Sequence, residues 1–186
     1  MKHFFLTATL CAGVSVLVGC QEKKVTTTII TKKPVAVSQP AGIQRTGNYD
    51  QTIDVDWVGS TYQVVVSRSS DESLPPVTDE SGVKYYDNSV TVKVVRQDGS
   101  EFFSRKFTKK DFAAYIDESY MSRSVLLGVV FYRAEVNDLC FAASVGSPDK
   151  LSDEFVPLVV KLNRMGTLAI SKDTKLDTNA SDADEV

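Results

Sequence analysis

The chain has 186 residues, of which 42% are hydrophobic, and its formal net charge is −3 at pH 7. This slightly acidic balance argues against a nucleic-acid partner, which would require clustered lysine and arginine side chains and a high isoelectric point. The chain contains one histidine and three cysteines, so few residues are available for histidine-dependent catalysis or for disulfide bonds.

Residues 1–19 have the pattern of an export signal. Lys2 and His3 give the segment a short positive start, and an apolar stretch runs from Phe4 to Val18. This stretch is interrupted by polar residues and is shorter than the ~20 apolar residues of a membrane-spanning helix. We therefore predict a lipoprotein signal peptide over residues 1–19.

The sequence LVGC at residues 17–20 resembles the bacterial lipobox, a motif in which the cysteine is acylated and becomes the mature N-terminus. The resemblance implies a lipid anchor at Cys20, and two or more acyl chains would hold the protein to a membrane without spanning it. Gln21 stands where an aspartate would, by resemblance to Gram-negative sorting, favour the inner membrane. We therefore expect outer-membrane attachment on the periplasmic side. The alternative is that Cys20 only neighbours an ordinary cleavage site.

Removal of the signal peptide would leave few histidine or cysteine side chains in the mature protein. It would remove Cys11 and the only histidine, His3. With Cys20 acylated, Cys140 would remain alone, and its apolar neighbours predict a buried thiol rather than a nucleophile. The sequence contains no G-x-S-x-G, Walker, G-x-G-x-x-G, H-E-x-x-H or C-x-x-C motif. We therefore expect no enzyme activity, no catalytic residues, no cofactor and no metal site.

The remaining chain divides by composition into three parts. Residues 20–48 are rich in threonine, lysine, valine and proline, which predicts a lipidated flexible tether. Residues 174–186 are polar and acidic, which predicts a disordered tail. Residues 49–173 are expected to form one β domain.

The domain sequence is dominated by hairpin patterns. Ile53, Val55 and Trp57 recur at every second position, which predicts a strand with one buried face. Residues 61–68 repeat the alternation, and Gly59-Ser60 is the expected turn between the two strands. The same signals predict three further hairpins: residues 89–107 around Asp98-Gly99, residues 124–145 around Val136–Asp138, and residues 157–172 around Arg164–Gly166.

One segment departs from the period of two. Thr108 suits a helix N-cap with Asp111 three residues later, and Phe112, Tyr115 and Ile116 then fall on one side at helical spacing. We predict a short helix at about residues 108–118. Its aromatic side is expected to dock on the domain, because so short a helix needs packing to form.

Four hairpins provide eight antiparallel strands. Eight is the number at which an up-and-down barrel closes around packed side chains or one small ligand, and closure would remove exposed strand edges. Gly128, inside an almost continuously apolar strand, suits a bulge or bend. We therefore predict a mainly β fold with a closed barrel; a two-sheet β-sandwich is the alternative.

A family resemblance points the same way. The run KYYDNSVTVKVV, the DGSEFF turn, the FTKKDF helix start and the lipobox together resemble uncharacterised lipoproteins of Bacteroides-type gut bacteria, a domain of unknown function with a lipocalin-like barrel. The resemblance covers residues 49–172 and implies the barrel. It brings no known active-site residues and implies no activity.

Two acidic groups are candidates for carboxylate chemistry. Asp54 and Asp56 share one side of a strand, and solvent-facing alternation explains them better than a Ca²⁺ site, which needs six to eight oxygen ligands. Asp79, Glu80 and Asp87 belong to a second group in a loop long enough to act as a lid.

Aromatic side chains supply the candidate ligand contacts. Tyr85 and Tyr86 adjoin the second acidic group, and either could stack on a sugar or apolar ligand at a barrel mouth. The alternative is that they pin the loop to the domain. Trp57 is the third candidate.

Three functions remain open from the sequence. The first is a non-catalytic binding module of the cell envelope that takes a small apolar or mixed ligand. The second is an accessory subunit that presents a surface to an envelope protein. The third and least favoured is an enzyme that uses Asp and Glu chemistry.

Overall fold

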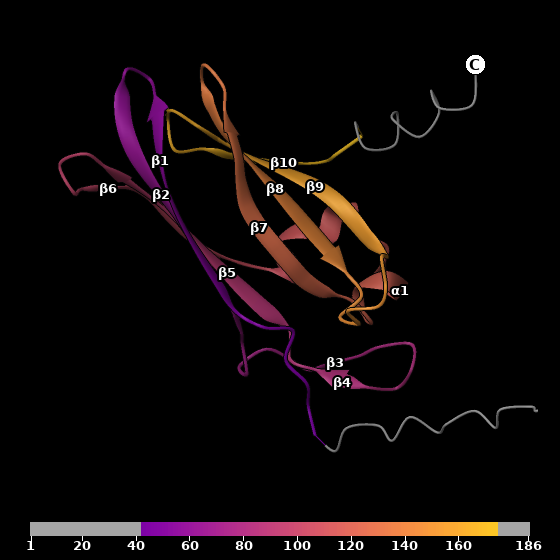
Figure 1. Cartoon of the computed structure of the whole chain (residues 1–186). Coiled ribbons are helices and arrows are strands. Elements are labelled where there is room, and N and C mark those ends of the chain that lie inside the picture. The colour runs from indigo at the N-terminus through magenta and orange to yellow at the C-terminus, as the bar shows by residue number, and fades with distance from the viewer. Residues whose placement is uncertain (1–41, 175–186) are drawn as a thin grey trace, which may run out of the picture. The chain divides into compact units, whose positions relative to one another are not determined.

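The computed structural model describes residues 42–174. The predictions for the signal peptide, Cys20, most of the tether and the acidic tail lie outside this range. The described part is mainly β and contains two four-stranded antiparallel sheets and one two-stranded hairpin, as Figure 1 shows.

Each large sheet is built from strands that are consecutive or nearly consecutive along the chain. The first sheet has the order β1 (Tyr49–Trp57), β2 (Ser60–Ser70), β5 (Asn88–Arg96), β6 (Glu101–Thr108). The second has the order β10 (Leu168–Lys172), β9 (Phe155–Asn163), β8 (Asp138–Gly146), β7 (Val125–Ala134). The other elements are β3 (Val77–Thr78), β4 (Lys84–Tyr85), the 3₁₀ helix η1 (Lys109–Tyr115) and α1 (Glu118–Met121).

The predicted closed barrel is wrong, and the sandwich alternative fits the sheet order. A meander barrel would pair β1 with β10 and β6 with β7, whereas these strands are sheet edges. Side chains of the first sheet instead meet the edge strand β7. The Tyr49 hydroxyl donates to the carbonyl of Val129 at 2.9 Å, and the Asn88 amide donates to that of Leu126 at 2.8 Å. These donors satisfy two backbone carbonyls of β7, a strand that pairs with β8 alone.

The space between the sheets is filled by a continuous apolar core. Buried residues alternate along most of the inner strands, as predicted, whereas β8 buries Leu139, Cys140 and Phe141 in succession. We expected the interior of the domain to admit a ligand, but the protein's own side chains occupy it. The largest fully buried ones are Phe107, Phe112, Phe141, Leu126, Leu139, Leu158 and Leu162.

All four predicted hairpins are confirmed, although turn boundaries differ by one residue; the β7–β8 turn is residues 135–137 rather than 136–138. Trp57 pairs directly with Ser60, so the first turn is Val58-Gly59 rather than Gly59-Ser60. Both turn residues have positive φ, 53° for Val58 and 74° for Gly59, as a two-residue turn of type I′ requires. The register shift between Leu126 and Gly128 confirms the predicted bulge in β7.

The predicted helix is present as the shorter η1, followed by the separate α1. The Asp111 carboxylate accepts from the Thr108 N–H at 2.8 Å, which caps its start. Phe112 is fully buried and its ring lies 6.2 Å from that of Phe107. The Tyr115 hydroxyl donates to the carbonyl of Ile170 at 2.6 Å. The predicted docking of this side is thus confirmed, and η1 contacts both β6 and β10.

Residues 42–48, which we expected in the tether, are attached to the domain. Gln44 forms a parallel bridge with Tyr85, and its N–H donates to the carbonyl of Lys84 at 2.7 Å. The guanidinium of Arg68, which is only 8% exposed, donates to the carbonyl of Gly47 at 2.9 Å and to the hydroxyl of Thr46 at 2.6 Å. These contacts form a clamp that holds the segment against β2 and β4.

Candidate functional site

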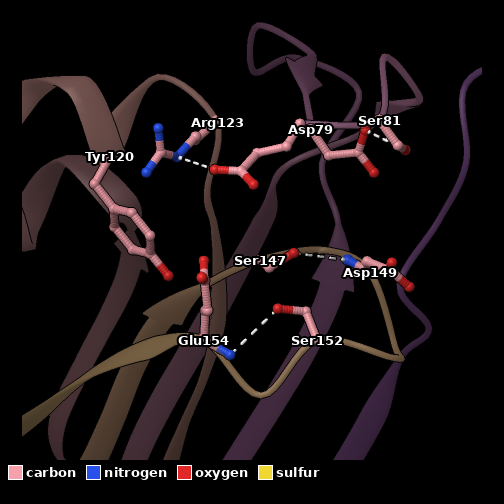
Figure 2. Close-up of a pocket in the computed structure, with 9 residues that line it drawn as sticks. Asp79, Ser81, Tyr120, Arg123, Ser147, Asp149, Ser152 and Glu154 are labelled. Atoms are coloured by element: carbon pink, nitrogen blue, oxygen red, sulfur yellow. Dashed lines mark hydrogen bonds and ion pairs between the residues drawn. The ribbon is translucent and has the colours of Figure 1, made fainter.

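A polar pocket of about 160 Å³ lies where three loop regions meet (Figure 2). The regions are the β3–β4 turn, the α1 region and the connection between β8 and β9. Figure 1 places them at the end of the domain away from the hairpin turn that joins β1 and β2. The lining residues are Asp79, Glu80, Ser81, Tyr120, Arg123, Ser147, Asp149, Ser152 and Glu154.

The β8–β9 connection is held in shape by its own hydrogen bonds. The Ser147 N–H donates to the carbonyl of Glu154 at 3.1 Å, and the Ser152 hydroxyl accepts from the Glu154 N–H at 3.2 Å. At the base of the connection, a Cβ on Gly146 would lie 2.5 Å from the Glu154 carbonyl oxygen. Only glycine permits this close approach, so the sequence fixes the position of the pocket wall.

The β3–β4 turn brings two carboxylates to the opposite wall. The Asp79 carboxylate accepts from the Val83 N–H and from the Ser81 hydroxyl, each at 2.8 Å, which stabilises the turn. The adjacent Glu80 forms an ion pair with Arg123 at 3.2 Å. Both partners are substantially exposed, so this pair contributes little to stability. It places a guanidinium at the rim.

The Tyr120 hydroxyl is the distinctive group of the pocket. It is buried and makes no hydrogen bond of standard geometry within the described residues, although the Ser147 N–H lies close enough to oppose the rise in its pKa. Burial and the negative charge of Glu154 raise the pKa of the Tyr120 phenol, which therefore keeps its proton as a donor. In Figure 2 the hydroxyl points toward the Glu154 side of the pocket. The lining contains one guanidinium and four carboxylates, those of Asp79, Glu80, Asp149 and Glu154.

A comparison with protein families identifies the family of this chain. A family model described as a domain of unknown function, DUF4738, matches residues 29–170. The chain belongs to the DUF4738 family. No curated protein matched it. Family membership therefore assigns no activity to the chain.

The described part of the chain offers no grouping of three or more His, Cys, Asp or Glu side chains that could hold a metal ion. The pocket carboxylates are spread over two separate segments, the β3–β4 turn and the β8–β9 connection. Between residues 42 and 174, none of the helices has the length and apolar character needed to cross a bilayer.

The predicted aromatic contacts are not among the residues that line the pocket. Trp57 is 3% exposed and packs edge-on against Tyr62 and Phe102, with ring centroids 5.3 and 5.7 Å away. Tyr86 lies under the Arg45 guanidinium, 5.0 Å from its ring centroid. Tyr85 is half-buried, and burial together with nearby carboxylates raises the pKa of its phenol. A ligand role for these residues stays a prediction.

The acidic residues that the sequence singled out lie in different environments. Asp79 and Glu80 line the pocket, whereas Asp87 is buried, pairs with Lys109 at 3.3 Å and accepts from the Leu126 N–H at 2.9 Å. Asp54 and Asp56 are exposed on β1, as predicted. Both accept cross-strand hydrogen bonds, from Gln63 at 3.2 Å and Thr61 at 2.8 Å respectively.

Cys140 is buried, as the sequence predicted. It lines a depression of about 630 Å³ together with residues of β7, β9 and the end of β10. Burial and the nearby Glu135 carboxylate raise the pKa of the Cys140 thiol, which disfavours a reactive thiolate.

Sequence reasoning missed Tyr120, Arg123 and Glu154. Their segments carry no motif, but one signal was available. Residues 147–154 form an eight-residue polar connection between strands, whereas the other hairpins of the two large sheets turn within two to four residues. An unusually long, polar connection is a place where binding residues gather.

Proposed function

We propose that this protein is a lipid-anchored, non-catalytic binding module of the bacterial cell envelope. The lipobox-like LVGC sequence supports acylation at Cys20, and Gln21 supports attachment to the outer membrane with the domain in the periplasm. The resemblance to Bacteroides-type lipoproteins supports the same placement. Because side chains fill the space between the sheets, we place the binding site at the polar pocket and not in the interior.

The buried Tyr120 hydroxyl, which makes no hydrogen bond of standard geometry within the described residues, is the observation that carries the binding role. A buried polar group is costly unless it is hydrogen-bonded, so a ligand that reaches it would recover a bond that the protein alone does not make. The surrounding carboxylates outnumber Arg123, which favours a ligand with a cationic group. An ammonium group has three N–H donors, so it can donate to Glu154 and to the oxygen of the Tyr120 hydroxyl at once.

A catalytic role has less support from the same residues. Asp79 is engaged by the β3–β4 turn and Glu80 by Arg123. Two-carboxylate hydrolysis requires two carboxyl groups that are free to act on one substrate. Because two of the four pocket carboxylates are already engaged, binding is the function that we put forward.

A titration followed by amide NMR tests the pocket. We expect n-butylammonium to shift the Ser147 and Ser152 amide signals in a saturable way, and butyrate to leave them unchanged. Tyr120→Phe and Glu154→Gln should each weaken the response. Asp56→Asn removes a carboxylate on the outer face of β1 and serves as the matched control. Equal shifts with butyrate, or equal weakening by Asp56→Asn, would contradict the proposal.

Palmitate labelling in a bacterial host tests the anchor. The full chain should incorporate the label, Cys20→Ser should abolish incorporation, and Cys140→Ser should leave it intact. An unlabelled full chain would overturn the anchored location and would leave the pocket titration unaffected.

A further inference from the structure

Three hairpin turns meet at the end of the domain opposite the pocket. The Trp57 indole N–H, beside the β1–β2 turn, donates to the Glu135 carbonyl in the β7–β8 turn at 3.1 Å. The Arg164 N–H, in the β9–β10 turn, donates to the carbonyl of Asn137 at 3.0 Å. Figure 1 shows the same three turns gathered at one end. They therefore form a connected surface.

Each of these turns exposes one apolar side chain. Val58 is 49% exposed, Val136 is 87% exposed and Met165 is 81% exposed. Each is a direct chain neighbour of a residue in the two connecting hydrogen bonds. We call these three residues the tip surface. Single exposed apolar residues need no explanation, but three at adjoining turn positions suggest a contact.

The backbone conformation of Val58 is a second observation in favour of a contact at the tip surface. Its φ of 53° is the only positive value for a non-glycine residue among residues 42–174. A β-branched residue is strongly disfavoured in this conformation, where Asn-Gly would be the preferred turn sequence. Valine here costs stability and exposes apolar surface to water. Strain of this kind is typical of positions kept for an interaction.

We propose that the tip surface inserts into the interface of the lipid bilayer that carries the Cys20 anchor. The proposal rests on the lipid-anchored function put forward above. The contact would be shallow, with the apolar side chains among the upper acyl chains and the turn backbones at headgroup level.

The size of the tip favours a bilayer over a protein partner. A stable protein interface buries about 800 Å² per partner, far more than three side chains on separate turns can offer. A bilayer requires no matching shape, and the anchor already holds the domain at high local concentration. A weak, three-residue contact is therefore sufficient beside a membrane and insufficient in solution.

Charge and chain length are compatible with this contact. The Glu135 carboxylate is ion-paired with Arg133 at 2.6 Å and Lys161 at 2.8 Å, and Arg164 is exposed on the third turn, where it can meet lipid phosphates. The 21 residues from 21 to 41 could span at most about 70 Å if extended. Strands β1 and β2, of 9 and 11 residues, are about 30 to 36 Å long. The anchor can therefore reach a bilayer at the tip end.

Fluorescence quenching by lipids brominated on their acyl chains gives the test. Val136→Trp and Leu151→Trp each add an indole at a highly exposed position, 87% and 95% exposed respectively, at opposite ends of the domain. Both acylated proteins would be reconstituted into vesicles of phosphatidylethanolamine and phosphatidylglycerol. Trp57, the only native tryptophan, is a common background. We expect loss of most of the added emission for Val136→Trp and little loss for Leu151→Trp.

Two further variants keep the result interpretable. Val58→Asn and Met165→Asp, combined with Val136→Trp, should largely restore the emission while the protein still floats with the vesicles. Equal quenching at both ends, or none at Val136→Trp in a protein that floats, would overturn the tip proposal and leave the anchor intact. Failure to float would instead overturn the anchor. A shift of Val136→Trp emission only on addition of envelope protein would also overturn the bilayer contact.

Discussion

The Asn88 side chain joins β5 of the first sheet to β7 of the second through a hydrogen bond to the Leu126 carbonyl at 2.8 Å. Asn88 is fully buried and donates as well to the hydroxyl of Thr46 at 3.0 Å. One amide thus connects both sheets and the segment that precedes β1. Because such bonds need matched positions, they fix how one sheet lies on the other, which apolar packing alone leaves adjustable.

Replacement of Asn88 by leucine should destabilise the domain strongly. The change retains volume but leaves the Leu126 carbonyl buried without its donor, which costs about 2 kcal/mol of unfolding free energy. The midpoint of urea unfolding should fall accordingly. Gln97→Leu, at an exposed position in the β5–β6 turn, is the control and should change stability little. Equal stability of the two variants would contradict the role given to Asn88.

Val58→Asn should stabilise the domain. Asparagine tolerates positive φ far better than valine, so the change should add about 1 kcal/mol to the unfolding free energy. Val136→Asn also replaces an exposed apolar residue in a turn, but Val136 does not have a positive φ. It should therefore leave the urea midpoint nearly unchanged. A lower midpoint for Val58→Asn would show that the valine packs favourably in the turn.

Gly146→Ala should disrupt the pocket, and Gly128→Ala should be tolerated. The added Cβ of Gly146→Ala would lie 2.5 Å from the Glu154 carbonyl oxygen, whereas nothing lies within 4 Å of the same atom at position 128. The backbone must shift in the first case, at a cost of about 1 to 3 kcal/mol. Urea unfolding measures the loss, and amide NMR should localise the shifts to residues 147–154. Similar behaviour of both variants would contradict this assignment.

Acid titration should reveal the ion pairs around Glu135. Hydrogen bonds from Lys161 and Arg133 lower the pKa of the Glu135 carboxyl to about 2 from an ordinary value of 4.5. Because the folded-state pKa is lowered, the stabilisation is present above pH 4.5 and is lost as the pH falls toward 2. Carboxyl ¹³C NMR should find a higher Glu135 pKa in Lys161→Gln. Lys150→Gln, in the β8–β9 connection, should leave it unchanged. An unaltered Glu135 pKa in Lys161→Gln would show that the Lys161 contact is not maintained in solution.

The hairpins could be predicted because their signals are local. Alternating apolar residues and the Asp98-Gly99 turn depend only on neighbours in the chain. The first turn was displaced by one residue because Val58 occupies a position that turn chemistry reserves for asparagine or glycine. The β3–β4 hairpin was missed because each of its strands has only two residues, too few to show a period.

The arrangement of the sheets could not be predicted in the same way. The choice between barrel and sandwich depends on contacts such as that of Tyr49 with the Val129 carbonyl, which joins residues 80 positions apart. Nothing in the local pattern of either segment encodes this pairing. The pocket likewise depends on contacts between residues that are far apart in the sequence. Asp79 and Glu80 stood out as an acidic pair, but Tyr120 and Glu154 join them only through folding.

The clamp on residues 42–48 determines how the domain responds to a mechanical load. A pull on the chain at residue 42 acts first on the bonds of Gln44 to β4, and next on those of Arg68 to Thr46 and Gly47. Only after these rupture does the force reach β1. The edge strand is thereby shielded from being peeled away, so a domain held by its N-terminal segment can stay folded under tension.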